Sequence, residues 1–303
     1  PITQDNTSVE YYCTIFAAAE SPLTEGLLWT GSDDGLIHVS KNGGKDWSNV
    51  TPKGMPEWMM INSIEPSVFD PATCYVAATK YKTGDFNPYL YKTTDYGASW
   101  KKITKGINKE HFTRVVREDP NQKGLLYAGT ETGMYISFND GDSWQEFQLN
   151  LPIVPITDLT IKDGNLIVAT QGRSLWILDD LSVLHQLANA KNKGTYLFTP
   201  KDTYRMGGGS RAGSLTEGAN HPSGVMTYFN LANSADKKVT LSYLSMANDT
   251  IKKFSTSPDK IKNIEISDDL KSNLEIDTQE LTDKYIKKVD EMLSVKEKDI
   301  LTL

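Results

Sequence analysis

A short turn sequence occurs three times in this chain and constrains its fold more than any other feature. Residues 93–100 and 137–144 read Ser/Thr, any residue, Asp/Asn, any residue, Gly, any residue, Ser, Trp, and residues 40–47 match the pattern more loosely. The Asp or Asn side chain can bond the backbone two residues on, and the glycine permits a positive φ. The tryptophan buries a large apolar face. Three copies, each after a β-rich run, indicate an internal repeat built from hairpins.

The residues that define these turns are expected to be structural rather than catalytic. Asn42 and Asn139 stand where Asp95 stands in the middle copy, and Asp46 replaces the usual Ser or Thr. Asn can make the same turn as Asp, so the fold prediction does not depend on this difference. The defining positions are Ser40, Asn42, Gly44, Trp47, Thr93, Asp95, Gly97, Trp100, Ser137, Asn139, Gly141 and Trp144.

Apolar runs around each turn predict four short antiparallel strands in about forty residues, the size of a propeller blade. A fourth repeat follows at residues 156–178 without the turn, and it is expected to be a last blade degraded at its outer edge. The predicted fold is therefore all-β, with propeller blades over residues 1–187. A polar linker over 188–194, a reduced β-sandwich-like region over 195–270 and a helical tail over 271–303 are expected to follow, with the helix itself at about 278–294.

Composition excludes several classes of function. The formal net charge is -7 and the pI is about 5.2, which argues against a nucleic-acid surface. No apolar run is long enough to span a membrane. The four histidines and two cysteines show no metal-ligand spacing, so neither a metal nor another cofactor is expected.

Residues 29–35, 91–97 and 169–176, together with the three turns, resemble the late blades of large bacterial exported proteins. These belong to the sortilin-like (VPS10-type) or BNR-repeat (Asp-box) family and are often labelled glycosyl hydrolases. The resemblance implies the last blades, about four, of a larger propeller in a secreted, periplasmic or cell-surface protein. It also implies that further blades come from a longer parent chain or another subunit, and that ligands bind the loops opposite the Asp boxes.

Those opposite loops supply the candidate site residues. Four acids are candidate catalytic carboxylates, although each is individually more typical of a turn or a solvated surface: Asp33, Asp34, Asp85 and Glu131. Three aromatic residues and one cation are candidate ligand-binding residues: Trp58, Tyr81, Phe86 and Arg173. Paired carboxylates can hydrolyse a glycosidic bond, and aromatic rings can stack on sugars.

Two functions therefore stay open. The first is a binding or scaffold propeller for a protein, peptide or glycan, and it is the preferred prediction because the sequence shows no assembled carboxylate pair. The alternative is a glycoside hydrolase that uses paired Asp or Glu side chains on the loop face. A carboxylate pair about 5–10 Å apart in an aromatic-lined cleft would favour hydrolysis.

Overall fold

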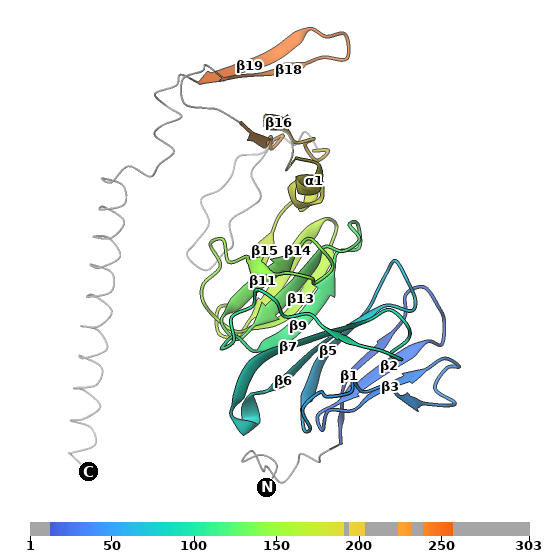
Figure 1. Ribbon diagram of the computed structural model, residues 1–303. Helices are drawn as coiled ribbons and strands as arrows, with labels where there is room; N and C mark the ends of the chain where they lie inside the picture. The colour runs from blue at the N-terminus through green and yellow to red at the C-terminus, as the bar shows by residue number, and fades with distance from the viewer. Residues whose placement is uncertain (1–12, 191–193, 204–223, 232–238, 257–303) are drawn as a thin grey trace, which may run out of the picture. The chain divides into compact units, whose positions relative to one another are not determined.

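The computed structural model describes residues 13–190, 194–203, 224–231 and 239–256. Within these residues the fold is all-β, with one α-helix and one 3₁₀ turn (Figure 1). Contacts divide the chain into two units, residues 1–192 with 197–228, and residues 193–196 with 229–303. The first unit contains the predicted repeats.

Three blades are four-stranded antiparallel sheets with their strands in sequence order. Blade 1 consists of β1 (Ile15–Glu20), β2 (Leu28–Ser32), β3 (Ile37–Ser40) and β4 (Ser48–Asn49). Blade 2 consists of β5 (Met60–Pro66), β6 (Cys74–Lys80), β7 (Asp85–Thr93) and β8 (Lys101–Lys102). Blade 3 consists of β9 (Thr113–Glu118), β10 (Leu126–Thr130), β11 (Gly133–Ser137) and β12 (Gln145–Glu146). The repeat inferred from the sequence is therefore confirmed as a set of propeller-like blades.

Blade 4 has three strands, β13 (Ile156–Lys162), β14 (Asn165–Thr170) and β15 (Leu175–Leu178). The chain then enters α1 (Ser182–Ala190), a helix that the sequence analysis did not predict. Because α1 extends to Ala190, it includes the first residues of the region predicted as a linker. His185 Nε2 lies 2.9 Å from the buried carboxylate of Asp119, which ties α1 to blade 3.

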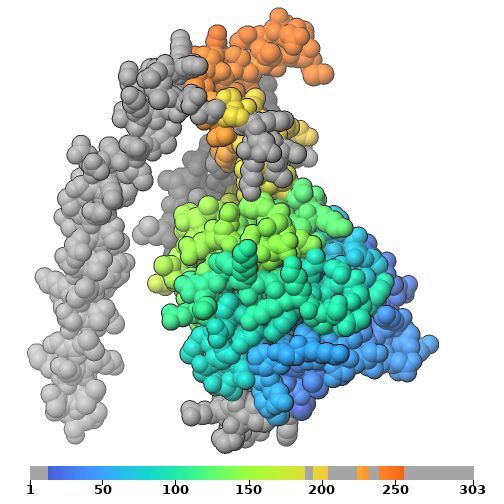
Figure 2. Space-filling model, in the orientation of Figure 1, coloured from blue at the N-terminus to red at the C-terminus, as the bar shows by residue number. Residues whose placement is uncertain are grey.

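Neighbouring blades bury opposite faces of each sheet, because side chains alternate along a strand. In blade 3, Tyr135 faces the core shared with blade 2, whereas Met134 and Ile136 face the core shared with blade 4. Trp29 of blade 1 is fully buried in the core shared with blade 2. The sheets thus stack through apolar faces, and the space-filling view shows the first unit as a continuous body along these blades (Figure 2).

The three Asp boxes make the same hydrogen bonds despite their different residues. In each box the Ser or Thr hydroxyl accepts the backbone N–H of the glycine, at 2.9 Å in Gly44 and Gly97 and 3.0 Å in Gly141. The Asx oxygen accepts a backbone N–H four residues on, at 2.9 Å in all three. Asn is therefore an adequate replacement for Asp at the backbone contacts.

The hydrogen bond between the Asx side chain and the side chain four residues later explains why Asp46 is tolerated in the first box. Asp95 accepts the Ser99 hydroxyl at 2.6 Å, and this bond lowers the pKa of the Asp95 carboxyl below its usual range. In the first box the polarity is reversed, since the Asn42 amide donates to the Asp46 carboxylate at 2.8 Å. An acid at the last position is compatible with the turn because the central residue there is an amide.

Two glycines in the turns, the box glycine Gly141 and Gly43 in the first turn, allow a direct test of this packing. Gly141 has φ +82° and a β-carbon there would lie 2.6 Å from Ile103, whereas Gly43 has φ +71° and open space around it. We expect Gly141→Ala to lower the free energy of unfolding by about 2–4 kcal/mol, through backbone strain plus a clash with Ile103. Gly43→Ala should cost only about 1 kcal/mol, through strain alone. Urea denaturation measures both, and equal losses would contradict the proposed clash.

The rest of the described chain contains two small ladders. β16 (Tyr196–Leu197) pairs with β17 (Phe229–Asn230), and β18 (Val239–Leu244) pairs in antiparallel register with β19 (Thr250–Thr256). These strands lie in the region predicted as a reduced β-sandwich, which stays a prediction. The predicted helix at 278–294 and the tail over 271–303 lie outside the described residues.

Candidate functional site

The first strands of the blades lie side by side and enclose a polar cleft. Contacts join β1 to β5, β5 to β9 and β9 to β13, so these four strands form the inner wall of the first unit (Figure 1). The cleft has a volume of about 310 Å³. Its polar lining residues come from three of these strands: Asn62, Ser63, Arg114, Arg117, Thr157 and Asp158.

Arg117 on β9 organises the cleft by joining three blades. Its guanidinium donates to Ser63 Oγ at 2.7 Å, to Asp158 Oδ1 at 2.7 Å and to the Leu159 carbonyl at 2.8 Å. Glu65 of blade 2 lies 3.5 Å from the same guanidinium. Arg117 is therefore a charged cross-link between β5, β9 and β13 as well as part of the cleft wall.

The carboxyl pKa of Glu65 differs between the folded and unfolded chain, and this difference makes stability depend on pH. Burial raises the pKa of its carboxyl to about 7, although the Arg117 charge opposes the shift. The folded state therefore holds a proton that the unfolded state releases near 4.5, the ordinary pKa of a glutamate side chain. This proton contributes stability that is complete below that value and is lost as the pH rises through about 7.

We expect the free energy of unfolding to fall by about 1–3 kcal/mol between pH 5 and pH 8 because of Glu65. Glu65→Gln should flatten that slope, because the amide carries no titrating proton. Urea midpoints measured across this pH range, with Glu57→Gln as a control at a residue exposed to solvent, provide the test. An unchanged slope in Glu65→Gln would contradict the assignment.

Five side chains gather beside the cleft, near the turns between the second and third strands of blades 2 and 3. We call them the rim cluster: Tyr81, Phe86, Phe112, Arg114 and Glu131. The rings of Tyr81 and Phe112 stack with centroids 4.9 Å apart, and Phe86 lies 6.1 Å from Phe112. The guanidinium of Arg114 lies over both stacked rings, at 5.6 Å and 5.2 Å. Arg114 also donates to Glu131 at 2.6 Å. Phe86 is 51% exposed and presents its ring to solvent.

His111 precedes Phe112 and contacts blade 3 through Tyr135. Its Nδ1 lies 2.8 Å from the Tyr135 hydroxyl, which also accepts the Asn108 backbone N–H at 3.4 Å. Burial raises the pKa of the Tyr135 hydroxyl. These contacts hold the loop that precedes β9 against blade 3, and they fix the starting position of Phe112 and Arg114.

The four acids predicted as catalytic candidates have separate, local roles. Asp33 accepts the Thr14 backbone N–H at 2.9 Å, and Asp34 accepts the Ser32 hydroxyl. Asp85 begins β7 rather than lying in a loop, and it accepts the Tyr89 hydroxyl at 2.6 Å. Glu131 is paired with Arg114. Each acid therefore serves a different partner, and none of these bonds joins one acid to another.

The predicted ligand-binding residues divide into two groups. Tyr81, in the turn after β6, and Phe86, at the start of β7, come together in the rim cluster through Phe112. Trp58 lies before β5, is 40% exposed and has a positive φ of 61°. Arg173 is exposed in the turn between β14 and β15, where its side chain contacts the Gly172 carbonyl at 3.3 Å. Trp58 and Arg173 are not members of the rim cluster.

Sequence reasoning did not nominate Phe112, Arg114 or Arg117. Arg114 and Arg117 lie on the inner strand β9, whereas the predicted site residues were those of the loops. Their spacing of three residues would place them on opposite faces of an ideal strand, but the register of β9 is irregular between Thr113 and Val115, and both line the cleft. The signal that could have identified Arg114 is the blade register, because the start of each inner strand lies beside the loops between the second and third strands.

Within the described residues, no group of three or more His, Cys, Asp or Glu side chains could hold a metal ion. None of the described helices is both long enough and apolar enough to cross a bilayer.

No protein-family model matches the chain. Among curated proteins, an oligoxyloglucan-reducing end-specific xyloglucanase of Emericella nidulans is 24% identical over 111 residues, which is 35% of this chain and 13% of that protein. A ribosome-recycling factor of Akkermansia muciniphila is 60% identical over 30 residues, which is 10% of this chain and 16% of that protein. The chain thus spans less than a fifth of the length of either curated relative.

Several solved structures have partial similarity to the chain. YCF48 bound to D1 peptide covers 55% of this chain and 52% of its own, with 19% identity and a TM-score of 0.43. The GH74 xyloglucanase of Xanthomonas campestris covers 54% of this chain and 29% of its own, with 16% identity and a TM-score of 0.42. An ancestral GH74 enzyme covers 81% and 33%, with 15% identity and a TM-score of 0.43.

Proposed function

We propose that this chain is part of an extracytoplasmic binding propeller whose rim cluster and polar cleft hold a glycan. The observation that carries the proposal is the exposed Phe86 ring, supported from below by the Tyr81–Phe112 stack. A sugar offers a face of C–H groups to such a ring and hydroxyls to neighbouring donors and acceptors. Arg114 belongs to both the rim cluster and the cleft, so it joins the apolar platform to the polar lining.

The charges of the site also favour a neutral polar ligand. Arg114 is paired with Glu131, and Arg117 is paired with Glu65 and Asp158. Neither guanidinium offers an uncompensated charge to an anion. Hydroxyl-rich ligands do not need such a charge, because paired side chains can still donate and accept hydrogen bonds.

The extracytoplasmic location in this proposal rests on the family resemblance. The three Asp boxes and the phrases at residues 29–35, 91–97 and 169–176 resemble those of exported proteins. The sortilin-like relationship rests on the same turns and phrases in the sequence.

Phe86→Ala tests the platform with little risk to the fold, because the ring is half-exposed. A glycan array probed with the full chain would select the ligand, and isothermal titration would give its affinity. We expect Phe86→Ala to weaken binding at least about tenfold, as loss of a stacking ring should. Phe69→Ala is the matched control, since Phe69 is also partly exposed but lies in the turn between β5 and β6. Equal effects of the two changes, or binding of peptides alone, would contradict the proposal.

A glycoside hydrolase is the second candidate, and one pair of side chains favours it. Glu65 and Asp158 bind the same Arg117 guanidinium, and burial raises the pKa of the Glu65 carboxyl to about 7. A pair of carboxyl groups, one of which holds a proton near neutral pH, is the combination that glycosidases use. If the chain hydrolyses glycans, release of reducing sugar should fall at least about a hundredfold in both Glu65→Gln and Asp158→Asn. No release by the unmodified chain would leave the binding function.

A further inference from the structure

The outer strands of blades 1–3 follow one sequence rule. Each begins after a box tryptophan, contains two polar residues and ends at an apolar residue. The three segments are Trp47-Ser48-Asn49-Val50, Trp100-Lys101-Lys102-Ile103 and Trp144-Gln145-Glu146-Phe147. The apolar residue donates its backbone N–H to the third strand of its own blade, at 2.8 Å for Val50 and at 2.9 Å for Ile103 and Phe147.

Blade 4 has no such segment among the described residues, and the outer edge of β15 is unpaired there. The register of blades 3 and 4 makes Leu175 the counterpart of Met134 and Ile177 the counterpart of Ile136. Met134 and Ile136 are 3% and 0% exposed, whereas Leu175 and Ile177 are 68% and 60% exposed. Met134 and Ile136 are covered by blade 4, with which they share a core, whereas Leu175 and Ile177 lie on the corresponding face of β15 and belong to none of the buried cores of the described residues.

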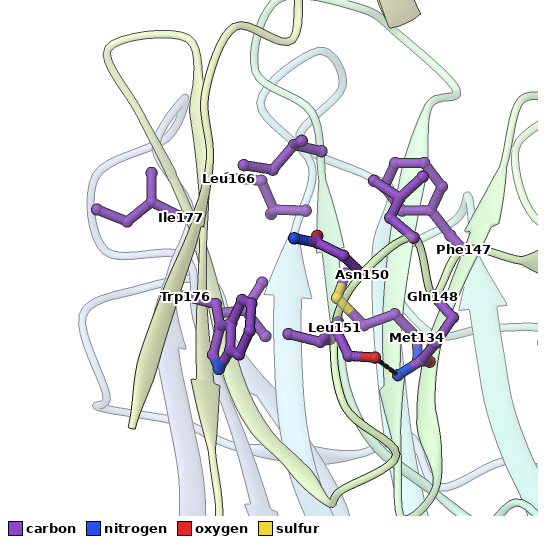
Figure 3. A pocket seen from close by; sticks show the side chains of 11 residues that line it. Met134, Phe147, Gln148, Asn150, Leu151, Leu166, Trp176 and Ile177 are labelled. Carbon is purple, nitrogen blue, oxygen red and sulfur yellow. Dashed lines mark hydrogen bonds between the residues drawn. The ribbon is translucent and has the colours of Figure 1, made fainter. Parts of the chain in front are cut away.

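A pocket lies beside this edge at the position where a box tryptophan lies in blade 3. Trp144 packs in one core with Ile103, Ile107, Leu126 and Tyr135. The pocket is lined by the counterparts of those four residues, Phe147, Leu151, Leu166 and Trp176 (Figure 3). The correspondence extends to the backbone, because Ile107 and Leu151 each bond the carbonyl three residues earlier, at 3.1 Å and 2.9 Å.

The box tryptophans also show which polar atom an indole would reach. Trp100 Nε1 donates to the Val50 carbonyl at 2.6 Å, and Trp144 Nε1 donates to the Ile103 carbonyl at 2.7 Å. Each acceptor is the last residue of the outer-strand segment in the preceding blade. By the same rule, the Phe147 carbonyl is the acceptor for an indole in the pocket of blade 4.

We infer that β15 and this pocket form a docking site for an extended segment of another polypeptide with the sequence pattern tryptophan, polar, polar, apolar. The segment pairs with β15 as a fourth strand, and its indole enters the pocket between Phe147 and Trp176. Strand addition to an exposed edge supplies affinity through the main chain and specificity through such a pocket. The residues outside the described ranges contain no tryptophan, so they do not supply this pattern.

This site is separate from the rim cluster, and it does not depend on the proposed glycan function. A fluorescein-labelled peptide with the sequence of residues 143–150 is the probe, titrated into the full chain by fluorescence anisotropy. The first control peptide carries Ala for Trp, which removes the indole. The second carries N-methyl-Phe, which keeps every side chain but removes the N–H that would donate to the Leu175 carbonyl.

We expect saturable binding of the parent peptide and at least about tenfold weaker binding of both control peptides. Hydrogen exchange should slow at the amides of residues 175–178 when the parent peptide binds, and it should be unchanged at the amides of β3. Trp176→Ala, with its fold checked by near-ultraviolet circular dichroism, should weaken binding of the parent peptide.

Three results would overturn the inference. One is binding of the control peptides as tight as that of the parent. Another is binding without slower exchange at residues 175–178. The third is no binding at millimolar peptide, whether or not the amides of β15 are already protected by other parts of the chain.

Discussion

The structure depends on the hydrogen bond that a box tryptophan makes to the blade before it. Trp100 and Trp144 each bury an indole between two sheets and donate Nε1 to a carbonyl at the end of the preceding outer strand. The box sets the position of the tryptophan, because the hydroxyl, the Asx oxygen and the glycine of the box form one turn. A local turn motif is thereby converted into a contact between blades. Trp47, whose Nε1 bonds the nearby Gly44 carbonyl instead, is 43% exposed.

A second set of contacts joins the blades at the inner wall. The Arg117 guanidinium binds groups from β5 and β13 while its own strand belongs to blade 3. This cross-link places charged and polar side chains together in the cleft, and burial there shifts the ionisation of Glu65. Arg117 and Glu65 therefore contribute to stability and also line or flank the cleft. A substitution of either residue can change folding as well as function, so folding needs a separate measurement. The rim cluster is better suited to functional tests because Phe86 is half-exposed.

Much of the fold could be predicted because its information is local. The turn motif fixes hairpins, and alternation of apolar residues fixes which strands follow them. The four blades, the missing outer strand of the last blade and the structural role of the boxes were all predicted this way. The helix α1 was not, because it is short and Leu184 packs against the core of blades 3 and 4 only in the tertiary structure. Leu181, which precedes the helix, is fully buried in the core shared by blades 3 and 4.

The turns, the strands and the repeat are encoded along the chain, because each arises from residues within a few positions of one another. The loop pattern also nominated Tyr81 and Phe86, although Phe86 belongs to the start of β7. Their partners depend on tertiary packing, since Phe112 and Arg114 come from the next blade and reach Tyr81 through the stacking of sheets. The same is true of Arg117 and Glu65, which lie 52 positions apart in sequence yet 3.5 Å apart in space. Contacts between distant residues depend on how sheets stack, and a pattern read along one strand does not contain that information.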